Sequence, residues 1–268
     1  MKNRLDVRMT ENGFCETRAK AQNLIRAGKV TVNGTPVTKT GTMVDDTDEI
    51  IVTHETMQFV GRGGYKLLKA IQEFNIDVRG LCCIDAGAST GGFTDCMLQN
   101  GAARVYAIDV GTDQLDARLR ADSRVISMEQ TNIRDVSPEA IGGQADFLAA
   151  DVSFVSLRLV LPCFASLLKD GARAVCLIKP QFEAGKSCVG KHGVVKDRKV
   201  HRSVISEVLE CAVQEGFRID GLTWSPIQGQ NGNTEYLFAA TKNGQQNSIM
   251  DSKSIERVVD EAFLHYSE

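Results

Sequence analysis

Residues 85–93, Asp-Ala-Gly-Ala-Ser-Thr-Gly-Gly-Phe, decide the fold of this chain. They follow a short apolar run at 81–84 and lead into Thr-Asp-Cys-Met-Leu at 94–98, which is typical of the first turns of a helix. Strand, glycine-rich turn and helix in this order indicate a ligand site, because glycines let the backbone approach a ligand and a helix N-terminus offers N–H groups. The alternative interpretation is a glycine turn in an α/β protein that has a structural role only.

The acids around this turn indicate the class of ligand. Ser89 stands where the dinucleotide fingerprint has its second glycine, and Asp85, at the end of the first strand, would repel a pyrophosphate. Asp109 follows the next apolar strand and is placed to accept hydrogen bonds from a ribose. S-adenosylmethionine, a nucleoside with positive charge and no diphosphate, fits best. We expect it to be bound by Asp85, Gly87, Ala88, Ser89, Thr90, Gly91, Gly92, Phe93, Asp109, Asn132 and Asp151. A plain turn residue is the alternative for Asn132.

Composition is that of a globular protein, with 43% hydrophobic and 24% charged residues among 268. The net charge is −3, but residues 1–40 hold eight Lys or Arg against three acids, which leaves −8 for the remainder. This asymmetry indicates a basic end that meets an acidic partner. The eight cysteines form no C-x-x-C pair and no zinc spacing, so we expect reduced core cysteines and no metal. With no secretory signal and no apolar run of membrane-spanning length, a cytoplasmic protein is predicted.

The sequence predicts that residues 5–56 form a small α+β unit. Residues 17–27 have the pattern of an amphipathic helix that ends at Gly28. Asn33-Gly34 between two short β-prone runs predicts a type I′ hairpin, and residues 48–52 predict a further strand. The helix carries Arg18, Lys20 and Arg26, a basic face that would suit RNA but is also what a solvated surface looks like.

The rest of the chain alternates strands and helices after an opening helix at 62–74. Strands are predicted near 82–86, 104–109, 124–127, 146–150, 173–178, 217–224 and 235–241. Helices are predicted near 91–100, 114–121, 156–168, 199–215 and 252–264. This alternation predicts an α/β doubly wound, mostly parallel sheet of seven strands, a Rossmann-like fold, whose ligands bind at the carboxyl ends of the strands.

Four charged residues fall at the ends of these elements. Asp151 and Lys179 end two strands, Glu235 opens the last strand, and Lys66 starts the helix before the sheet. A charged residue at the end of a strand is often simply solvated, so none of the four indicates a site by itself. Together, however, we expect them to converge at the cofactor. The four could neutralise one another while shifting the pKa of one lysine, which is how sites obtain a base.

The first unit resembles the S4-like RNA-binding domain. The resemblance lies in Arg-Leu-Asp-Val at 4–7, Thr-Arg-Ala-Lys-Ala at 17–21, residues 24–30 and Val-Asn-Gly at 32–34. It implies two helices and a hairpin that contact structured RNA through phosphates and shape. The residues expected to contact RNA are Arg4, Arg18, Lys20, Arg26, Lys29 and Asn33, with Arg62 from the following segment.

The chain as a whole resembles the TlyA (haemolysin A) family, which joins an S4-like domain to an FtsJ-type methyltransferase domain. The motifs that carry this resemblance are Arg-Gly-Gly-Tyr-Lys-Leu at 62–67, residues 85–94, Asp-Val-Ser-Phe at 151–154, Lys-Pro-Gln-Phe-Glu at 179–183 and Asn-Thr-Glu-Tyr at 233–236. It implies an S4-like domain at 1–58, a linker at 59–61, a methyltransferase domain at 62–244 and a tail with a helix at 245–268. His192, where the family pattern has glycine, and Cys188 are departures that leave the contacts of their loop open.

What the resemblance implies is S-adenosylmethionine-dependent 2′-O-methylation of cytidine in ribosomal RNA, with the Lys-Asp-Lys-Glu tetrad carried by Lys66, Asp151, Lys179 and Glu235. For that reaction Lys179 is the candidate base or hydroxyl-orienting group, with Asp151 and Glu235 setting its charge and geometry. Lys66 would steady the ribose or an adjacent phosphate. Three rival functions remain at this point. They are a catalytically silent RNA-binding or assembly factor, a membrane-active haemolysin, and a dinucleotide oxidoreductase, which Asp85 and Ser89 disfavour. The modified nucleotide, the ribosomal subunit and the oligomeric state, monomer or homodimer, stay open.

Overall fold

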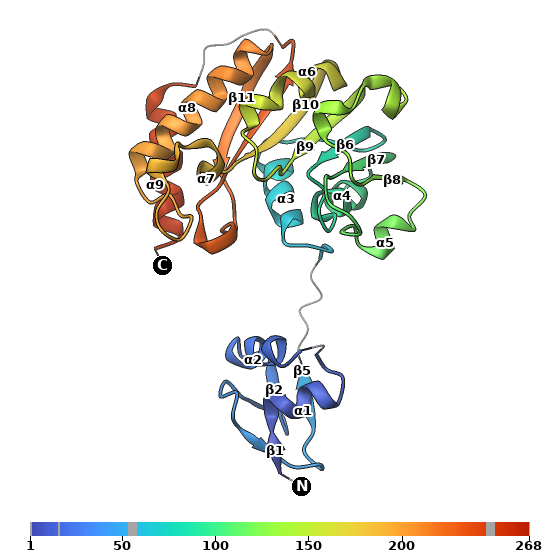
Figure 1. Cartoon of the computed structure of the whole chain (residues 1–268), viewed down its shortest axis with the longest axis vertical. Helices are drawn as coiled ribbons and strands as arrows, with labels where there is room; N and C mark the ends of the chain where they lie inside the picture. Colours follow the sequence, from blue (N-terminus) through green and yellow to red (C-terminus); the bar gives the residue numbers. More distant parts are fainter. Residues whose placement is uncertain (1, 16, 53–57, 245–249, 268) are drawn as a thin grey trace. The chain divides into compact units, whose positions relative to one another are not determined.

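The computed structural model describes residues 2–15, 17–52, 58–244 and 250–267, and the chain divides into two compact units, Met1–Met57 and Gln58–Glu268 (Figure 1). The division falls close to the predicted end of the first domain at residue 58.

The first unit packs two helices beside short strands. Leu5, Met9, Ala21, Ile25, Val30 and Val44 form its buried core. Its helices are α1 (Leu5–Glu11) and α2 (Arg18–Arg26). Its strands are β1 (Asn3–Arg4), β2 (Val30–Val32), β3 (Thr35–Pro36), β4 (Met43–Val44) and β5 (Ile50–Val52), with β1 paired to β4 and β2 lying between β3 and β5. The predicted α+β architecture is confirmed.

Local sequence signals in this unit act as predicted. After α2, Gly28 adopts φ +69°, which lets the Gly28 and Lys29 N–H groups bond back to the carbonyls of Ile25 and Leu24. Asn33 and Gly34 both have positive φ, +50° and +76°, as a type I′ turn between β2 and β3 requires.

The second unit is built on a seven-stranded sheet in the order β11-β12-β10-β9-β6-β7-β8. The pairs among β6, β7, β8, β9 and β10 are parallel, while β12 runs antiparallel to both β10 and β11. The predicted doubly wound, mostly parallel sheet is confirmed. The strands are β6 (Cys82–Ala86), β7 (Arg104–Ile108), β8 (Val125–Met128), β9 (Ala145–Ala150), β10 (Leu168–Ile178), β11 (Phe217–Trp224) and β12 (Tyr236–Lys242).

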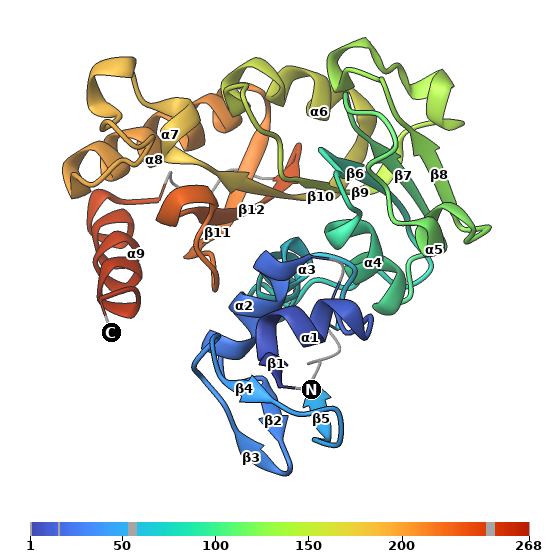
Figure 2. The same ribbon diagram turned by 60° about the horizontal axis from the view of Figure 1, so that its bottom comes forward.

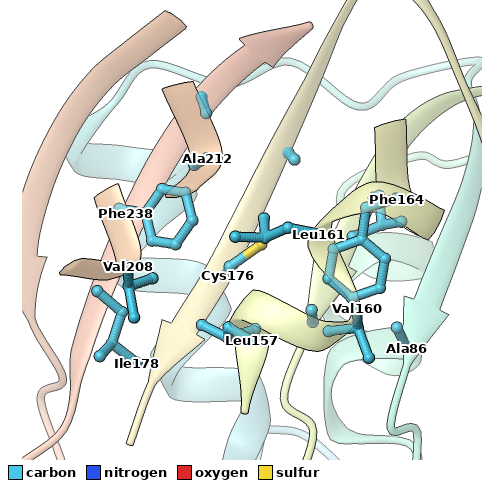
Figure 3. Close-up of a cluster of buried hydrophobic side chains, with 14 of the residues drawn as sticks. Ala86, Leu157, Val160, Leu161, Phe164, Cys176, Ile178, Val208, Ala212 and Phe238 are labelled. Carbon is cyan, nitrogen blue, oxygen red and sulfur yellow. The ribbon is translucent and has the colours of Figure 1, made fainter. Parts of the chain in front are cut away.

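Helices cover both faces of this sheet (Figure 2). Successive strand residues alternate between the faces, so that Ile84 and Ala86 join one core cluster while Cys83 joins the other. The first cluster contains residues of α6, α8 and α9, and the second contains residues of α3 and α4. Figure 3 shows part of the first, with Leu161 beside Cys176 and Val208 beside Phe238. The helices are α3 (Gly63–Glu73), α4 (Gly92–Gln99), α5 (Ala117–Arg120), α6 (Leu161–Leu167), α7 (Pro180–Glu183), α8 (Arg198–Gln214) and α9 (Ser252–His265).

Two helices are shorter than predicted. The helix predicted at 114–121 begins only at Ala117, because the backbone N–H groups of Asp113, Gln114 and Leu115 donate to the Glu129 carboxylate. The helix predicted at 156–168 divides into a 3-10 turn at Leu157–Leu159 and α6. Further 3-10 turns lie at Ile133–Asp135, Pro138–Ile141, Lys186–Cys188 and Gln230–Gly232.

The predicted linker at 59–61 is wrong, because these residues pack within the second unit. Phe59 is 2% exposed and makes an edge-on contact with Tyr65. The Val60 N–H donates to Asp95 Oδ2 over 2.8 Å. The predicted tail also belongs to this unit, since α9 buries Ile255, Val258 and Val259 against its core. Residues 53–57 and 245–249 lie outside the described residues.

Candidate functional site

Two adjoining cavities lie at the carboxyl ends of the central strands. The tetrad cavity, about 630 Å³, is lined by Lys66, Asp151, Lys179 and Glu235 among others. The Asp109 cavity, about 540 Å³, is lined by Asp109 and Asn132 among others. Both are lined by the same five residues, Gly87, Ser89, Asp151, Ser153 and Phe154, so the two cavities form one bipartite cleft.

The cleft lies at the topological switch point of the sheet. From β6 the parallel strands continue through β7 and β8 to one side, and through β9 and β10 to the other. The connections after β6 and β9 therefore diverge and leave a crevice at the carboxyl ends of these strands, where ligands bind in open α/β sheets.

The glycine-rich turn after β6 forms the floor of the cleft. Gly87 has φ +85°, and a side chain there would come within 2.8 Å of the Asp151 carbonyl oxygen. Ser89, which replaces the second glycine of the dinucleotide pattern, also has a positive φ of +47°. Of the expected cofactor residues in this turn, those that line the tetrad cavity are Gly87, Ala88, Ser89, Thr90, Gly92 and Phe93. Gly91 faces elsewhere: a side chain at Gly91 would strike Leu115 and Leu119.

Asp85 lies beneath the turn rather than on the cleft surface, which corrects the expectation that it faces the cofactor. Its side chain is 0% exposed, and its Oδ2 accepts hydrogen bonds from the Thr94 N–H at 2.8 Å and the Thr94 hydroxyl at 2.6 Å. Gly91, the residue before α4, has no side chain that could cap the helix, so Asp85 does so from the neighbouring strand. Burial raises the pKa of Asp85 to about 7 despite the opposing Thr94 hydrogen bonds. Its Oδ1 is buried with no hydrogen-bond partner in the described part of the chain.

The Asp109 cavity fits the nucleoside portion of S-adenosylmethionine. Asp109 accepts the Ser89 N–H at 2.8 Å and the Gly111 N–H at 2.7 Å, which hold its carboxylate at the cavity edge. The apolar part of the wall is made of Ile108, Val110, Ile133, Val152, Phe154, Val155 and Val160. The fixed carboxylate can accept hydrogen bonds from ribose hydroxyls, and the apolar walls can pack against a base. The volume of the cavity is also ordinary for a ligand site. Asn132 lines the cavity and also caps the turn at Ile133–Asp135 by accepting the Arg134 N–H.

The four residues of the expected tetrad lie in contact. Lys66 Nζ lies 2.8 Å from Glu235 Oε2 and 3.4 Å from Asp151 Oδ2. Lys179 Nζ lies 2.5 Å from Asp151 Oδ1. Lys66 and Lys179 are each 7% exposed and Glu235 is 1% exposed, so this balanced set of two cations and two anions is largely withdrawn from water. Such a set retains its charges only because each partner compensates the desolvation of the other.

The pairing within the tetrad differs from the expectation. Glu235 was predicted to act on Lys179, whereas the ion pairs join Glu235 to Lys66 and Asp151 to both lysines. Burial alone would lower the pKa of Lys66, but Asp151 and Glu235 outweigh it and raise that pKa above its ordinary value. Lys66 is therefore a fixed positive charge, and Lys179 is the lysine with a single carboxylate partner among the described residues.

Two residues at the site were missed by the sequence reasoning. The Ser153 hydroxyl lies 2.7 Å from Lys179 Nζ, and Gly229 lies so close to Glu235 that a side chain there would come within 2.0 Å of Oε1. Ser153 stands inside the Asp-Val-Ser-Phe motif, so that motif was an available signal. Gly229 belongs to a turn-rich segment in which no local feature distinguishes it.

The residues expected to contact RNA divide into two groups. Arg4 and Arg18 form ion pairs with the buried Asp6, and Asn33 bonds to Asp48 and to the Glu49 N–H, so these three also hold the first unit together. Their side chains remain exposed at the surface. The other four are exposed or half-buried, and Arg62 lines the tetrad cavity: Lys20, Arg26, Lys29 and Arg62.

Comparison with known proteins matches both units. The model of the S4 domain matches residues 3–50, and that of the FtsJ-like methyltransferase matches residues 59–242. The chain belongs to the FtsJ-like methyltransferase family.

Relatives of this FtsJ-like chain match both of its units. The 16S/23S rRNA (cytidine-2′-O)-methyltransferase TlyA of Mycobacterium tuberculosis is 42% identical, over 97% of this chain and 96% of that protein. Hemolysin A of Brachyspira hyodysenteriae is 43% identical over 87% and 98% of the two chains. A solved structure from Streptococcus thermophilus, also named a hemolysin, is 45% identical with a TM-score of 0.78 over 99% and 97%. In the described part of the FtsJ-like chain, no helix is long and apolar enough to cross a membrane.

Proposed function

We propose that this chain transfers a methyl group from S-adenosylmethionine to a ribose 2′-hydroxyl of ribosomal RNA, at a cytidine. The observation that carries the proposal is the continuity of the cleft, in which the tetrad adjoins a cavity suited to a nucleoside. The Mycobacterium tuberculosis relative is named for this reaction, on both 16S and 23S rRNA. Such an enzyme acts where ribosomes are found, in the cytoplasm.

For this reaction the protein must mainly position the two reactants and control the charge of the groups around them. S-adenosylmethionine supplies an activated methyl group on a sulfonium. The residues of the Asp109 cavity hold its nucleoside portion, so that the other end lies where the two cavities join. Asp151, which lines both cavities, stands at that junction. Alignment of the acceptor oxygen with the methyl group is the main contribution that a site of this kind makes to the rate.

Lys179 orients the acceptor hydroxyl, and it accepts the hydroxyl proton only in its neutral amine form, after its own extra proton has been lost to solvent, as the new oxygen–methyl bond forms and the sulfur–methyl bond breaks. Its Nζ is held by Asp151 Oδ1 on one side and the Ser153 hydroxyl on the other, and it reaches the tetrad cavity from the end of β10. Lys66, kept charged by two carboxylates, steadies the ribose or an adjacent phosphate. Glu235 fixes Lys66 and takes no direct part in proton removal.

The first unit supplies RNA affinity in this proposal. Arg18, Lys20 and Arg26 are exposed on α2, and residues 1–40 hold eight Lys or Arg against three acids. Lysine and arginine contacts to phosphates hold an RNA in place without reading its sequence. Ribosomal RNA or a ribosomal subunit is therefore the proposed partner.

The test is transfer of labelled methyl from S-adenosylmethionine to purified ribosomal subunits, naked ribosomal RNA and transfer RNA. We expect incorporation into ribosomal RNA that makes one linkage resistant to alkali. Lys179→Met should abolish transfer, with cofactor binding in equilibrium dialysis nearly unchanged. Lys242→Met is the matched control, because Lys242 is also largely buried and bonded to a carbonyl, that of Leu168, at the opposite end of β12.

The outcomes separate the rival functions. Cofactor binding without incorporation into any of these RNAs would overturn the proposal in favour of a silent RNA-binding factor. Full activity of Lys179→Met would overturn the role of Lys179 alone. Absence of cofactor binding would mean that residues 85–109 form a structural turn only.

A further inference from the structure

The segment at 189–195, here called the wall loop, closes one side of the tetrad cavity. Val189 and Gly193 line that cavity. The loop turns back on itself because the Gly190 N–H donates to the Val194 carbonyl and the Gly193 N–H donates to the Gly190 carbonyl. The loop carries little apolar burial of its own, since only Val195 at its end is a buried hydrophobic residue. Its position must therefore depend on the polar contacts that hold it.

Asn233 makes the first of these contacts. It is 2% exposed and stands two residues before Glu235. Its Nδ2 donates to the Gly193 carbonyl at 2.9 Å, and its Oδ1 accepts the Val195 N–H at 3.2 Å. Both ends of one amide thus bind the backbone of the wall loop, as a neighbouring strand would do.

His201 of α8 makes the second contact and extends it to β12. It is 0% exposed, with Nε2 2.9 Å from the Val195 carbonyl oxygen and Nδ1 2.8 Å from the Tyr236 hydroxyl. A carbonyl can only accept, so Nε2 carries the hydrogen and Nδ1 accepts from Tyr236 in the neutral ring. Burial lowers the pKa of His201 and raises that of Tyr236, which favours this neutral arrangement. The imidazole joins the end of the wall loop to the residue that follows Glu235.

We propose that His201 is a positioning residue that, with Asn233 and Tyr236, holds the wall loop against the strand that presents Glu235. This inference rests on the proposed function, because it assigns the wall loop to the side from which the RNA acceptor meets the tetrad. A buried side chain needed for packing alone would be apolar. Both ring nitrogens of His201 instead form hydrogen bonds to groups that flank the cavity. Its ring also packs edge-on against Phe263 of α9.

The test is limited digestion with trypsin. The rate of cleavage reports how readily the wall loop opens, and it can be measured without RNA. Lys186, Lys191 and Lys196 are exposed in and beside the wall loop. His201→Leu should raise the rate of cleavage at these three positions about tenfold, because cleavage follows local opening. His201→Gln, whose amide can still donate to the Val195 carbonyl, should return the rate towards that of the wild type. Tyr106→Phe is the control, since Tyr106 is a buried tyrosine of β7.

Tyr236→Phe serves if His201→Leu does not fold, since it removes only the hydroxyl and should raise loop cleavage by a smaller factor. In methyl transfer the variants should show a higher KM for RNA, with an unchanged Kd for S-adenosylmethionine. Loop cleavage no faster than in the wild type, or raised only in step with cleavage elsewhere in residues 58–268, would overturn the inference. A wild-type protein that transfers no methyl would overturn the proposed function instead, and the cleavage result would still stand.

Discussion

The Nζ atom of Lys66 lies 2.8 Å from Oε2 of Glu235, although 169 residues separate the two in sequence. Lys66 lies in the first turn of α3 and Glu235 directly precedes β12, so this contact ties the beginning of the second unit to its last strand. Both side chains are almost fully buried. Formation of the site and completion of the fold are therefore coupled.

Glu235→Gln should destabilise the protein by about 3 kcal/mol. The buried Lys66 would keep Asp151, whose Oδ2 lies 3.4 Å from Nζ, as its carboxylate partner. Urea unfolding would measure this loss. Lys66→Met combined with Glu235→Gln should recover much of the stability, because no unpaired charge remains, while methyl transfer stays low. Recovery of activity in the double variant would show that the pair serves stability only.

Gly229→Ala should displace Glu235 without disturbing the rest of the fold. An added Cβ would lie 2.0 Å from Glu235 Oε1, and the backbone at Gly229 is itself held by the Asn233 carbonyl. We expect methyl transfer to fall at least about tenfold, as small misplacements in a site do. Gly185→Ala is the control, since its nearest neighbour, the Ser187 hydroxyl, would be 4.0 Å away. Equal activity of the two variants would contradict this prediction.

The buried Asp85 should make stability fall as pH rises. Its folded pKa of about 7 lies above the ordinary 3.8, so the folded state binds the extra proton between these values and loses it as pH increases. At roughly 1.4 kcal/mol per pKa unit the change reaches about 4 kcal/mol. Unfolding free energies of the wild type minus those of Asp85→Asn should decrease across this range. A difference that does not vary with pH would contradict the prediction.

Asp6→Asn should loosen the first unit. The Asp6 side chain is 0% exposed and accepts hydrogen bonds from Arg4, Arg18 and Gln22. The Arg4 hydrogen bond lowers the Asp6 pKa most, against the effect of burial, so this stabilisation is present above the ordinary pKa of 3.8 and is lost as pH falls. We expect a loss of about 2 kcal/mol at neutral pH.

Hydrogen exchange of the α1 and α2 amides in the full chain would report this loss. The exchange of the second unit provides the internal reference. Unchanged protection of α1 and α2 in Asp6→Asn would show that the cluster around Asp6 contributes nothing to the first unit.

Residues 85–93, the Asn33-Gly34 hairpin and all seven strands of the large sheet were predictable, because each depends on the nearest few residues. Alternating apolar side chains define a strand, and positive φ at Asn33, Gly34 and Gly28 follows from local sterics. The convergence of Asp151 and Lys179 was also predictable, since parallel strands end at one edge of a sheet. Glu235 joins them because β12 is antiparallel to β10 and begins at that edge. The amino-acid order alone was sufficient for these features.

Other features needed the complete fold, because they depend on which groups share a space and how far water is excluded. Asp85 could be placed at a strand end from the sequence, but only the packing of α4 on β6 buries it and directs it to Thr94. The pairing of Glu235 with Lys66 rather than Lys179, and the contact of His201 with Tyr236, likewise join elements far apart in the chain. Local pattern selects the elements and the edge at which they meet, whereas the charge state and partner of each buried group follow from its three-dimensional surroundings.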